Sequence, residues 1–339
     1  MLYTRLPNTD IEVSKICLGG MSFGEKVSDW HQWIIGQKET TTVIERAFEL
    51  GINFIDTANV YAHGTSEKLI GQAIKELGIN REKIVLASKV FFNEGGSSAN
   101  AIHREIEGSL KRLGVDYLDL YILHRFDYNT PIEETLAALH QLVKSGKVRA
   151  IGASEMYAYQ FHHMIHALEQ NGWTPFSTMQ CHYNLLYRED ERELLPLCDE
   201  YGILPTPYSP LASGHLTRPQ WNSGSVRSKT DNTMKNKYDA GKNLDQPVIE
   251  RVKILSDRYG IPMSQVALAW QWSHRAASPI VGCSKPERVD QAVAALNLNL
   301  SKEDITYLEE PYQAHNVVGP ASRPGEKPNA GSHKNTETK

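Results

Sequence analysis

The stretch GINFIDTANVY, residues 51–61, indicates the fold class more directly than the rest of the chain. Its apolar run ends directly at Asp56, and Tyr61 follows a few residues later. In α/β barrels the strands run parallel, and catalytic side chains gather where the strands end. The stretch therefore predicts a buried strand, residues 53–56, with Asp56 and Tyr61 at its functional end.

Two further apolar runs end in the same way. Ile84–Ala87 leads to Lys89, and Leu118–Leu123 leads to His124. In a parallel sheet these side chains meet Asp56 and Tyr61 on one rim. A lysine ammonium beside a phenol lowers the pKa of the phenol, and an aspartate keeps the lysine charged and in place. The four residues therefore predict a proton-donating site.

Composition narrows the functional classes. The chain has 339 residues, 40% hydrophobic and 22% charged, which fits two ordinary domains or one barrel with insertions. Its net charge of −4 argues against a nucleic-acid partner. The N-terminus MLYTRLPNTD lacks a signal-peptide core, and no apolar run approaches the length of a membrane span. The four cysteines show no CxxC spacing, which indicates reduced thiols rather than a disulfide framework. We therefore expect a cytoplasmic protein that does not interact with membranes.

Strand-like and helix-like segments alternate along the chain. The predicted strands are Ile16–Leu18, Asn53–Asp56, Ile84–Ser88, Leu118–Leu123, Val148–Ala153, Thr178–Cys181, Ile203–Tyr208 and Ser278–Val281. Helical segments follow them, among them Ala99–Leu113, Pro131–Ser145, Tyr157–Gln170, Val248–Tyr259, Pro262–Ser273 and Glu287–Leu296. Eight such units favour a closed barrel over an open doubly wound sheet, and no GxGxxG follows an early strand.

The predicted fold class is therefore α/β, a (β/α)8 TIM barrel with three additions. Tyr3–Leu6 and Ile11–Val13 form an N-terminal β-hairpin, and Ser301–Glu310 forms an extra C-terminal helix. The polar segment Ser209–Asp245 follows the seventh strand and is too long for an ordinary connection, so we expect a functional loop or lid. Residues 1–318 are expected to form one domain and residues 319–339 a disordered tail.

Four motifs resemble those of the aldo-keto reductase family. Residues 51–61 match the signature G-x-N-x-x-D-T-A-x-x-Y, and SEKLIG, residues 66–71, continues it. LDLYILH, residues 118–124, resembles the fourth-strand motif, and IVGCSK, residues 280–285, resembles the eighth-strand cofactor motif. The resemblance runs from about residue 4 to residue 312. It implies a barrel that reduces the carbonyl group of a small molecule with a nicotinamide cofactor.

The resemblance also implies a role for each of the four rim residues. Tyr61 is the expected general acid that protonates the carbonyl oxygen, and Lys89 depresses the pKa of its phenol. His124 orients the carbonyl group, and Asp56 holds Lys89. An isolated aspartate or tyrosine after a strand is more often a capping or core residue. Four such residues in this family context favour the catalytic interpretation.

Cofactor contacts follow from the same resemblance. Ser154 and Gln180 are expected to hold the carboxamide, and the ring of Tyr208 is expected to stack on the nicotinamide. The segment after Tyr208 is expected to offer its backbone to the pyrophosphate, and Gly214 permits a close approach. The other cofactor contacts expected by resemblance are Gly20, Met21, Asp56, Ser209, Pro210, Leu211, Ala212 and Gly282.

The cofactor itself is expected to be NADP(H). Ser284, Lys285 and Arg288 match the positions of the 2′-phosphate ligands in the family, and they precede or begin a helix, where anions are favoured. Gln291 is expected to contact the adenine, although Ala292 stands where many members have asparagine. Arg227 is a weaker candidate for the phosphates, since a solvated loop arginine is about equally plausible.

Some features remain open. Trp30 and Trp33 lie in an insertion, Glu25–Lys38, where a pocket wall or an interface is as plausible as simple packing. His162 and His166 lie four residues apart, but no acidic or cysteine partner stands nearby in the sequence, so no metal site is expected. The sequence MQCHYNL, residues 179–185, resembles both the aryl-alcohol dehydrogenases and the potassium-channel β subunits. An alternative is therefore a weakly active protein whose main role is to bind a protein partner. The substrate and the oligomeric state cannot be inferred from the sequence.

Overall fold

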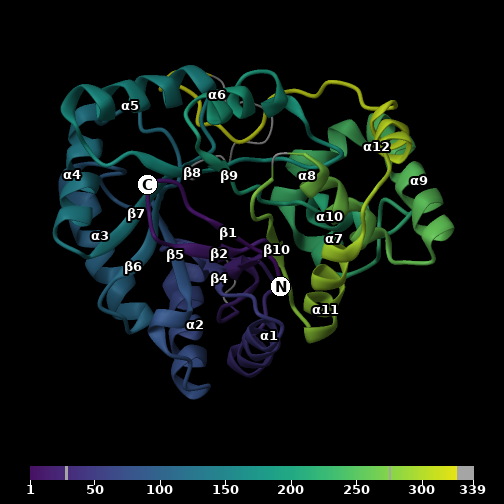
Figure 1. Cartoon of the computed structure of the whole chain (residues 1–339), viewed down its shortest axis with the longest axis horizontal. Helices are drawn as coiled ribbons and strands as arrows, with labels where there is room; N and C mark the ends of the chain where they lie inside the picture. Colours follow the sequence, from purple (N-terminus) through teal and green to yellow (C-terminus); the bar gives the residue numbers. More distant parts are fainter. Residues whose placement is uncertain (27–29, 275, 327–339) are drawn as a thin grey trace.

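The strands of the chain form a curled parallel sheet surrounded by helices (Figure 1). The computed structural model describes residues 1–26, 30–274 and 276–326. Within these residues the sheet has the strand order β10-β3-β4-β5-β6-β7-β8-β9, and neighbouring strands are parallel. The strands are β3 (Cys17–Gly19), β4 (Phe54–Asp56), β5 (Val85–Val90), β6 (Leu118–Leu123), β7 (Val148–Ser154), β8 (Phe176–Gln180), β9 (Leu204–Pro205) and β10 (Ile280–Gly282).

The sheet closes into a barrel between its two edge strands, β9 and β10. An isolated parallel bridge pairs Tyr208 with Ile280, and the Ile280 N–H donates to the Pro207 carbonyl oxygen at 2.8 Å. The predicted (β/α)8 barrel is thus confirmed. The seventh predicted strand, Ile203–Tyr208, is reduced to the two residues of β9. Pro205 and Pro207 lack the N–H groups that a regular ladder needs, which explains the shortening.

The outer layer consists of amphipathic helices. Helix α3 (Ala99–Leu113) illustrates the pattern, because its buried residues Ile102, Ile106 and Leu110 recur every four positions. Ser98 caps its N-terminus, and Gly114 ends it in the left-handed conformation. The other helices of this layer are α1 (Gln37–Glu49), α2 (Thr65–Glu76), α4 (Ile132–Lys144), α5 (Ala158–Asn171), α6 (Leu194–Glu200), α10 (Met263–Ser273) and α11 (Pro286–Ala294).

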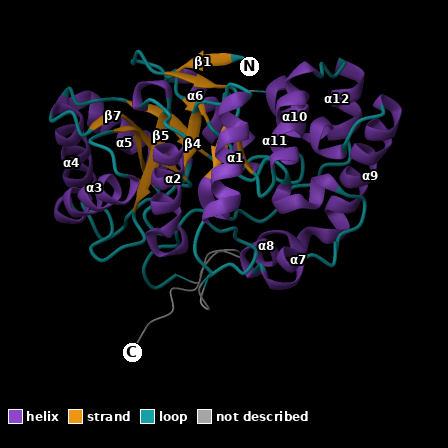
Figure 2. Ribbon diagram, turned by 90° about the horizontal axis from the view of Figure 1, so that it is seen from below, coloured by secondary structure: helices purple, strands orange, loops and turns teal. Residues whose placement is uncertain are grey.

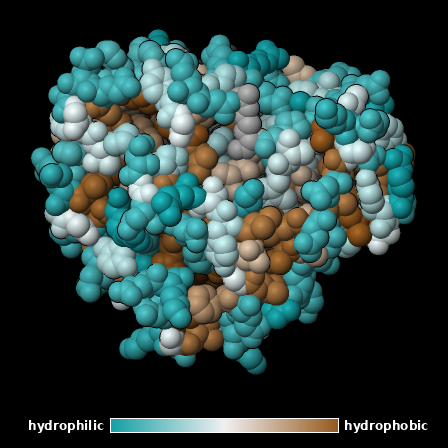
Figure 3. Space-filling view, viewed as in Figure 1, coloured by the Kyte–Doolittle hydropathy of each residue, from teal (hydrophilic) through white to brown (hydrophobic). Residues whose placement is uncertain are grey.

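The hairpin of β1 (Tyr3–Arg5) and β2 (Glu12–Ser14) closes one end of the barrel. Its apolar side chains Leu6, Ile11 and Val13 belong to the inner core, together with inward-facing residues of the barrel strands. Figure 2 shows the hairpin at one end of the barrel and helices α7 (Val226–Thr230) and α8 (Asn232–Tyr238) at the other. Hydrophilic residues cover most of the face seen in Figure 3, with hydrophobic residues between them.

Strand alternation directs the predicted site residues into the barrel. Side chains on a strand alternate between its two faces. Phe54 and Ala87 belong to the inner core, and Asp56 and Lys89 lie two residues further along the same strands. His124 stands in the same relation to the inward residue Ile122. The sequence pattern therefore aims these three side chains at the open, carboxyl end of the barrel.

The segment predicted as the loop Ser209–Asp245 contains helical structure, which corrects that prediction. It includes α7, α8 and the first residues of α9 (Lys242–Tyr259), which begins six residues before the predicted start. Ser225 and Asp231 cap α7 and α8 with their side chains, and Met234 and Tyr238 anchor α8 in the core. The helical stretches in this segment are short and separated by glycine and charged residues. The polar composition of the whole segment therefore predicted a loop.

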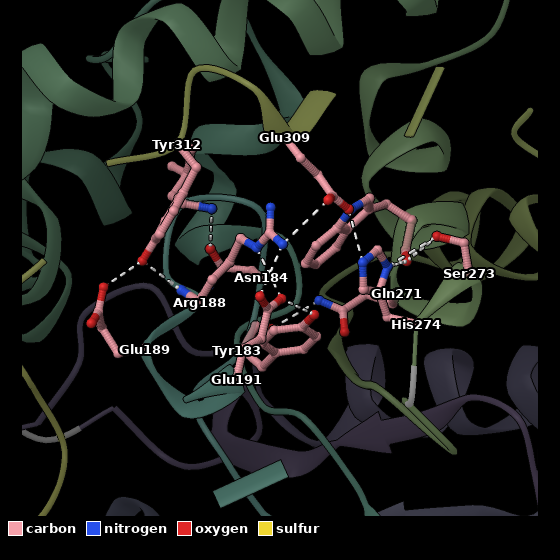
Figure 4. Close-up of polar contacts among 12 residues, drawn as sticks. Tyr183, Asn184, Arg188, Glu189, Glu191, Gln271, Ser273, His274, Glu309 and Tyr312 are labelled. Atoms are coloured by element: carbon pink, nitrogen blue, oxygen red, sulfur yellow. Dashed lines mark hydrogen bonds and ion pairs between the residues drawn. The ribbon is translucent and has the colours of Figure 1, made fainter. Parts of the chain in front are cut away.

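A polar network ties the segment after β8 to the C-terminal part of the chain (Figure 4). The Arg188 guanidinium donates to Glu191 and to Glu309, which lies on α12 (Lys302–Glu309). Tyr312 donates to Glu189 at 2.7 Å and accepts from the Arg188 N–H at 2.9 Å. Residues 313–326 continue from this network, while residues 327–339 of the predicted tail lie outside the described residues.

Two further findings concern the whole chain. No helix in the part of the chain that the structure describes combines the length and apolar character that a bilayer crossing requires. Cys17, Cys181, Cys198 and Cys283 are buried and free. Burial raises the pKa of each of these thiols above its ordinary value.

Candidate active site

Lys89 is the centre of the polar group at the open end of the barrel. Its side chain is completely buried, and its ammonium group makes three hydrogen bonds. Nζ donates to Asp56 Oδ1 at 2.5 Å, to the Thr57 carbonyl oxygen at 2.7 Å and to the Tyr61 hydroxyl at 3.2 Å. An ammonium group has three donors, so each has an acceptor. The structure thus brings together Asp56, Lys89 and Tyr61.

Tyr61 is held by a tight turn that follows β4. Residues Ala62 and His63 have φ values of 46° and 54°, a left-handed conformation that is costly for side chains other than glycine. Ala62 is buried, and its carbonyl oxygen accepts from the Thr65 hydroxyl at 2.7 Å. Packing therefore holds this turn, and the turn orients Tyr61 toward Lys89.

The electrostatic environment of Tyr61 differs from the expectation. Burial raises the pKa of its phenol above the ordinary value, and the positive charge of Lys89 opposes this effect only in part. Lys89 does lower the pKa of the Tyr61 phenol, as predicted. The effect of burial is larger, so the net shift of this pKa is upward. Tyr61 is therefore protonated at neutral pH.

His124 lies beside Tyr61, with 5.9 Å between the ring centroids and an edge-to-face arrangement. Phe92 packs on it in the same manner at 5.0 Å. Burial lowers the pKa of His124 well below its ordinary value, and the cations Lys89 and Arg125 lower it further. His124 is therefore neutral at physiological pH. Its buried Nδ1 has no hydrogen-bond partner among the residues that the structure describes.

Gln180 connects the polar group around Lys89 to the predicted carboxamide site. Its Nε2 donates to Asp56 Oδ2 at 3.0 Å, and its backbone carbonyl oxygen accepts from the Ser154 hydroxyl at 3.0 Å. The Ser154 oxygen and Gln180 Oε1 are acceptors that suit the NH2 group of a carboxamide. The structure therefore places the two predicted carboxamide ligands side by side, with Gln180 in contact with Asp56.

Tyr208 belongs to a stack of three rings. His182 lies parallel to Tyr208 at 5.0 Å between centroids, and Tyr187 lies on His182 at 4.3 Å. His182 Nε2 is also 2.7 Å from the hydroxyl of Tyr238, which lies on α8. The stack fixes the tilt of the Tyr208 ring, the property that a stacking partner for a nicotinamide needs.

Gly20 shows how closely the first strand approaches the site. A Cβ atom at this position would lie 2.9 Å from the Asp56 carbonyl oxygen, so a larger residue would displace Asp56. Met21 is the next residue in the same short turn, Gly20–Ser22. The Ser66 hydroxyl donates to the Gly20 carbonyl oxygen at 2.8 Å and fixes the turn.

The segment after Tyr208 has an unusual backbone. Ser209, Ala212 and Ser213 have φ values of 55°, 47° and 54°, and Gly214 has a φ of 101°. The N–H groups of Ala212, Ser213 and Gly214 already donate within the segment, to residues Ser209 and Leu211. Pro210 has no N–H. Contact between these amides and a pyrophosphate would therefore require the segment to rearrange.

The predicted 2′-phosphate ligands lie together at the start of α11. Arg288 Nη1 donates to the Ser284 hydroxyl at 3.1 Å, and Lys285 occupies the N-cap position. Gly282 ends β10 two residues before Ser284, and Gln291 is the sixth residue of α11. A hydroxyl, an ammonium and a guanidinium at a helix N-terminus fit a phosphate group. The residues present thus match the chemistry of NADP(H).

Arg227 has other partners in the structure. Its Nε donates to Asp231 at 3.0 Å, and its guanidinium lies 4.2 Å from the ring centroid of Trp33. Trp30 contacts His63 at 5.6 Å between centroids. The inserted segment that contains Trp30 and Trp33 therefore packs against the turn of Tyr61 and against α7. Its residues 27–29 lie outside the described residues.

Three charged residues near this site were not predicted from the sequence to belong to it. Arg125 and Glu155 directly follow His124 and Ser154, and Lys237 lies on α8. The first two could have been found by their position beside predicted site residues. Lys237 offered no such signal, because only the packing of α8 brings it to the barrel.

The sequence of the whole chain has relatives among known proteins. A sequence profile of the Aldo/keto reductase family matches residues 15–313. A versiconal hemiacetal acetate reductase of Aspergillus parasiticus is 38% identical over 351 residues, 96% of this chain and 100% of that protein. Putative aryl-alcohol dehydrogenases of Schizosaccharomyces pombe and Saccharomyces cerevisiae are 41% and 37% identical. The matches cover 92% and 91% of this chain, and 95% and 96% of those proteins.

Proposed function

The chain belongs to the aldo/keto reductase family, and we propose that it reduces aldehydes or ketones to alcohols with NADPH as the hydride donor. The observation that carries the proposal is the buried Lys89 ammonium, which contacts both Asp56 and Tyr61. Burying an ammonium group is costly unless charges and hydrogen bonds compensate. A structural role alone does not require a phenol among its partners, whereas proton transfer does.

The residues of the site would act as follows. The hydride that the carbonyl carbon accepts would come from NADPH when it is bound. Tyr61 donates its phenolic proton to the carbonyl oxygen as negative charge develops there. Lys89 stabilises the phenolate that remains, and Asp56 keeps Lys89 charged. Neutral His124 has one N–H, with which it would orient the carbonyl oxygen.

The same proposal assigns the cofactor contacts. Ser154 and Gln180 would hold the carboxamide, and Tyr208 would support one face of the nicotinamide. Ser284, Lys285 and Arg288 would bind the 2′-phosphate, which is why we propose NADP(H) over NAD(H). Because Arg227 already pairs with Asp231, it is the weakest of the assigned phosphate ligands.

Replacing Tyr61 by phenylalanine tests the proposal. Tyr61→Phe should reduce kcat for an aromatic aldehyde about 10²- to 10⁴-fold, because general acid catalysis contributes about that factor. The Kd for NADPH should stay within about twofold, since the phenolic proton is used only in the transition state. Tyr159→Phe, which removes the hydroxyl of an exposed tyrosine, is the matched control. A Tyr61→Phe enzyme with near-normal kcat would contradict the assigned role.

A further inference from the structure

Three charged side chains from different parts of the barrel meet beside the proposed nicotinamide site. Arg125 follows β6, Glu155 follows β7, and Lys237 lies on α8. The Arg125 guanidinium forms an ion pair with one oxygen of Glu155. The Lys237 ammonium lies 3.7 Å from the other oxygen. We refer to Arg125, Glu155 and Lys237 as the ion triad.

Two members of the ion triad are bonded to the backbone of proposed site residues. Arg125 Nη1 donates to the His124 carbonyl oxygen at 2.7 Å. The Glu155 N–H donates to the Gln180 carbonyl oxygen at 3.1 Å, the same oxygen that accepts from Ser154. The ion triad is therefore fixed relative to the carbonyl-orienting and carboxamide-binding residues.

The third member reaches the ring that is proposed to support the nicotinamide. Lys237 Nζ donates to the hydroxyl of Tyr208 and lies 4.2 Å from the centroid of its ring. The neighbouring Tyr238 hydroxyl approaches His182 on the far side of the same stack. Helix α8 thus holds a positive charge over the Tyr208 ring and next to its hydroxyl.

The ion triad is shielded from water. The side chains of Glu155, Lys237 and Arg125 are 2%, 10% and 15% exposed. Gly319, from the C-terminal segment, passes so close that a Cβ there would lie 2.8 Å from Glu155 Oε1. Glu155 itself keeps a φ of 42°, which the surrounding contacts must maintain. Charges in such a setting interact more strongly than charges on an open surface.

The local charge balance is positive. Arg125 and Lys237 bring two positive charges and Glu155 one negative charge, while Lys89 and Asp56 cancel each other. Burial lowers the pKa of Lys237 below its ordinary value, and the Glu155 carboxylate opposes this only in part by favouring the charged ammonium. Asp190 is also close to Glu155, but burial raises the pKa of its carboxyl group to about 8, so it is mostly neutral at pH 7. One positive charge therefore remains in excess.

We propose that the ion triad makes the enzyme discriminate between the oxidation states of its cofactor, with Lys237 as the residue that sets this preference. The inference rests on the proposed function. The nicotinamide ring is neutral in NADPH and carries a positive charge in NADP⁺. An excess positive charge beside Tyr208 repels the oxidised ring and leaves the neutral ring nearly unaffected. The protein binds NADPH more tightly than NADP⁺ and favours release of the oxidised form after reduction.

The test measures Kd for NADPH and NADP⁺ at pH 7 by quenching of tryptophan fluorescence, in the wild type and three variants. Lys237→Gln should lower the ratio Kd(NADP⁺)/Kd(NADPH) roughly tenfold, the order for two unit charges about 8 Å apart at an effective dielectric constant of about 30. Lys237→Arg keeps the charge and should keep most of the ratio.

Lys235→Gln is the matched control, because it removes the same charge from the same helix, at a side chain that donates to the Lys229 carbonyl oxygen. It should leave the ratio unchanged. If Lys237 had a merely structural role, Lys237→Gln would weaken the binding of both cofactors equally, and that result would overturn the inference. Thermal unfolding of the cofactor-free variants shows whether they fold. A folded wild type that binds neither cofactor would instead overturn the proposed function.

Discussion

At the scale of single residues, the chemistry of the site depends on opposing effects on two buried groups. Burial alone lowers the pKa of Lys89, but Asp56 and Tyr61 raise it above its ordinary value, so the ammonium stays charged. Burial raises the pKa of Tyr61, and Lys89 limits the rise. Under the proposed mechanism, the phenol therefore keeps its proton until the carbonyl oxygen accepts it.

Lys89→Met should therefore act on both the rate and the pH profile. Reduction needs the protonated phenol, so its rate is lost as pH rises through the pKa of Tyr61. Without Lys89 that pKa moves higher, and the alkaline limb of kcat should shift upward in pH. The rate at pH 7 should fall by about 10² or more, because the phenolate left by proton transfer loses its cation. A steady-state profile from pH 6 to 11 measures both. An unchanged profile would refute the coupling between Lys89 and Tyr61.

At the scale of elements, helices and strands were predicted correctly where the local sequence pattern and the tertiary packing favour the same structure. The strands that end at Asp56, Lys89 and His124 were predicted from apolar runs, because each run is both buried and regular. The helices α7 and α8 were missed, since they are short and lie in a polar segment. The contact of Lys237 with Tyr208 has no local signal at all, because it arises when α8 packs against the barrel.

Helix α11 carries a prediction of its own. Arg288→Ala should weaken NADPH binding far more than NADH binding, because only NADPH has a 2′-phosphate to pair with the guanidinium. Charge-assisted hydrogen bonds contribute about 1.5–3 kcal/mol, or about 10- to 150-fold in Kd. Lys285 and Ser284 remain, so the preference should narrow without inverting. Fluorescence titration of both cofactors measures it. Equal losses for the two cofactors would assign Arg288 to the adenosine or to the fold.

At the scale of the whole molecule, the sequence predicted the barrel, its hairpin and its extra C-terminal helix. The eight-unit alternation of strands and helices was sufficient for the barrel, because parallel strands with helices between them have few ways to close. The path of the chain after Tyr312 was not foreseen. Residues His315, Val318 and Gly319 return to the barrel and contact Asp245, Tyr187 and Glu155, partners that are 70 or more residues away in the sequence.

The burial of the cysteines has a consequence for survival of the enzyme among its own proposed substrates. Aldehydes and unsaturated carbonyl compounds are electrophiles that modify exposed thiolates. Cys198 and Cys283 are buried with pKa values raised to about 12, and burial raises the pKa values of Cys17 and Cys181 well above their ordinary value. Their sulfurs are thus both inaccessible and protonated, and a protonated thiol is a poor nucleophile.

The folded enzyme should therefore resist self-inactivation. Incubation with acrolein or iodoacetamide at pH 7 should leave kcat within about 20% of its starting value, and mass spectrometry should find no modified cysteine. The same reagents after unfolding should label four thiols. Rapid labelling of the native protein would mean that the barrel opens often enough to expose its core. In that case the chemistry that the enzyme performs would also limit its working life.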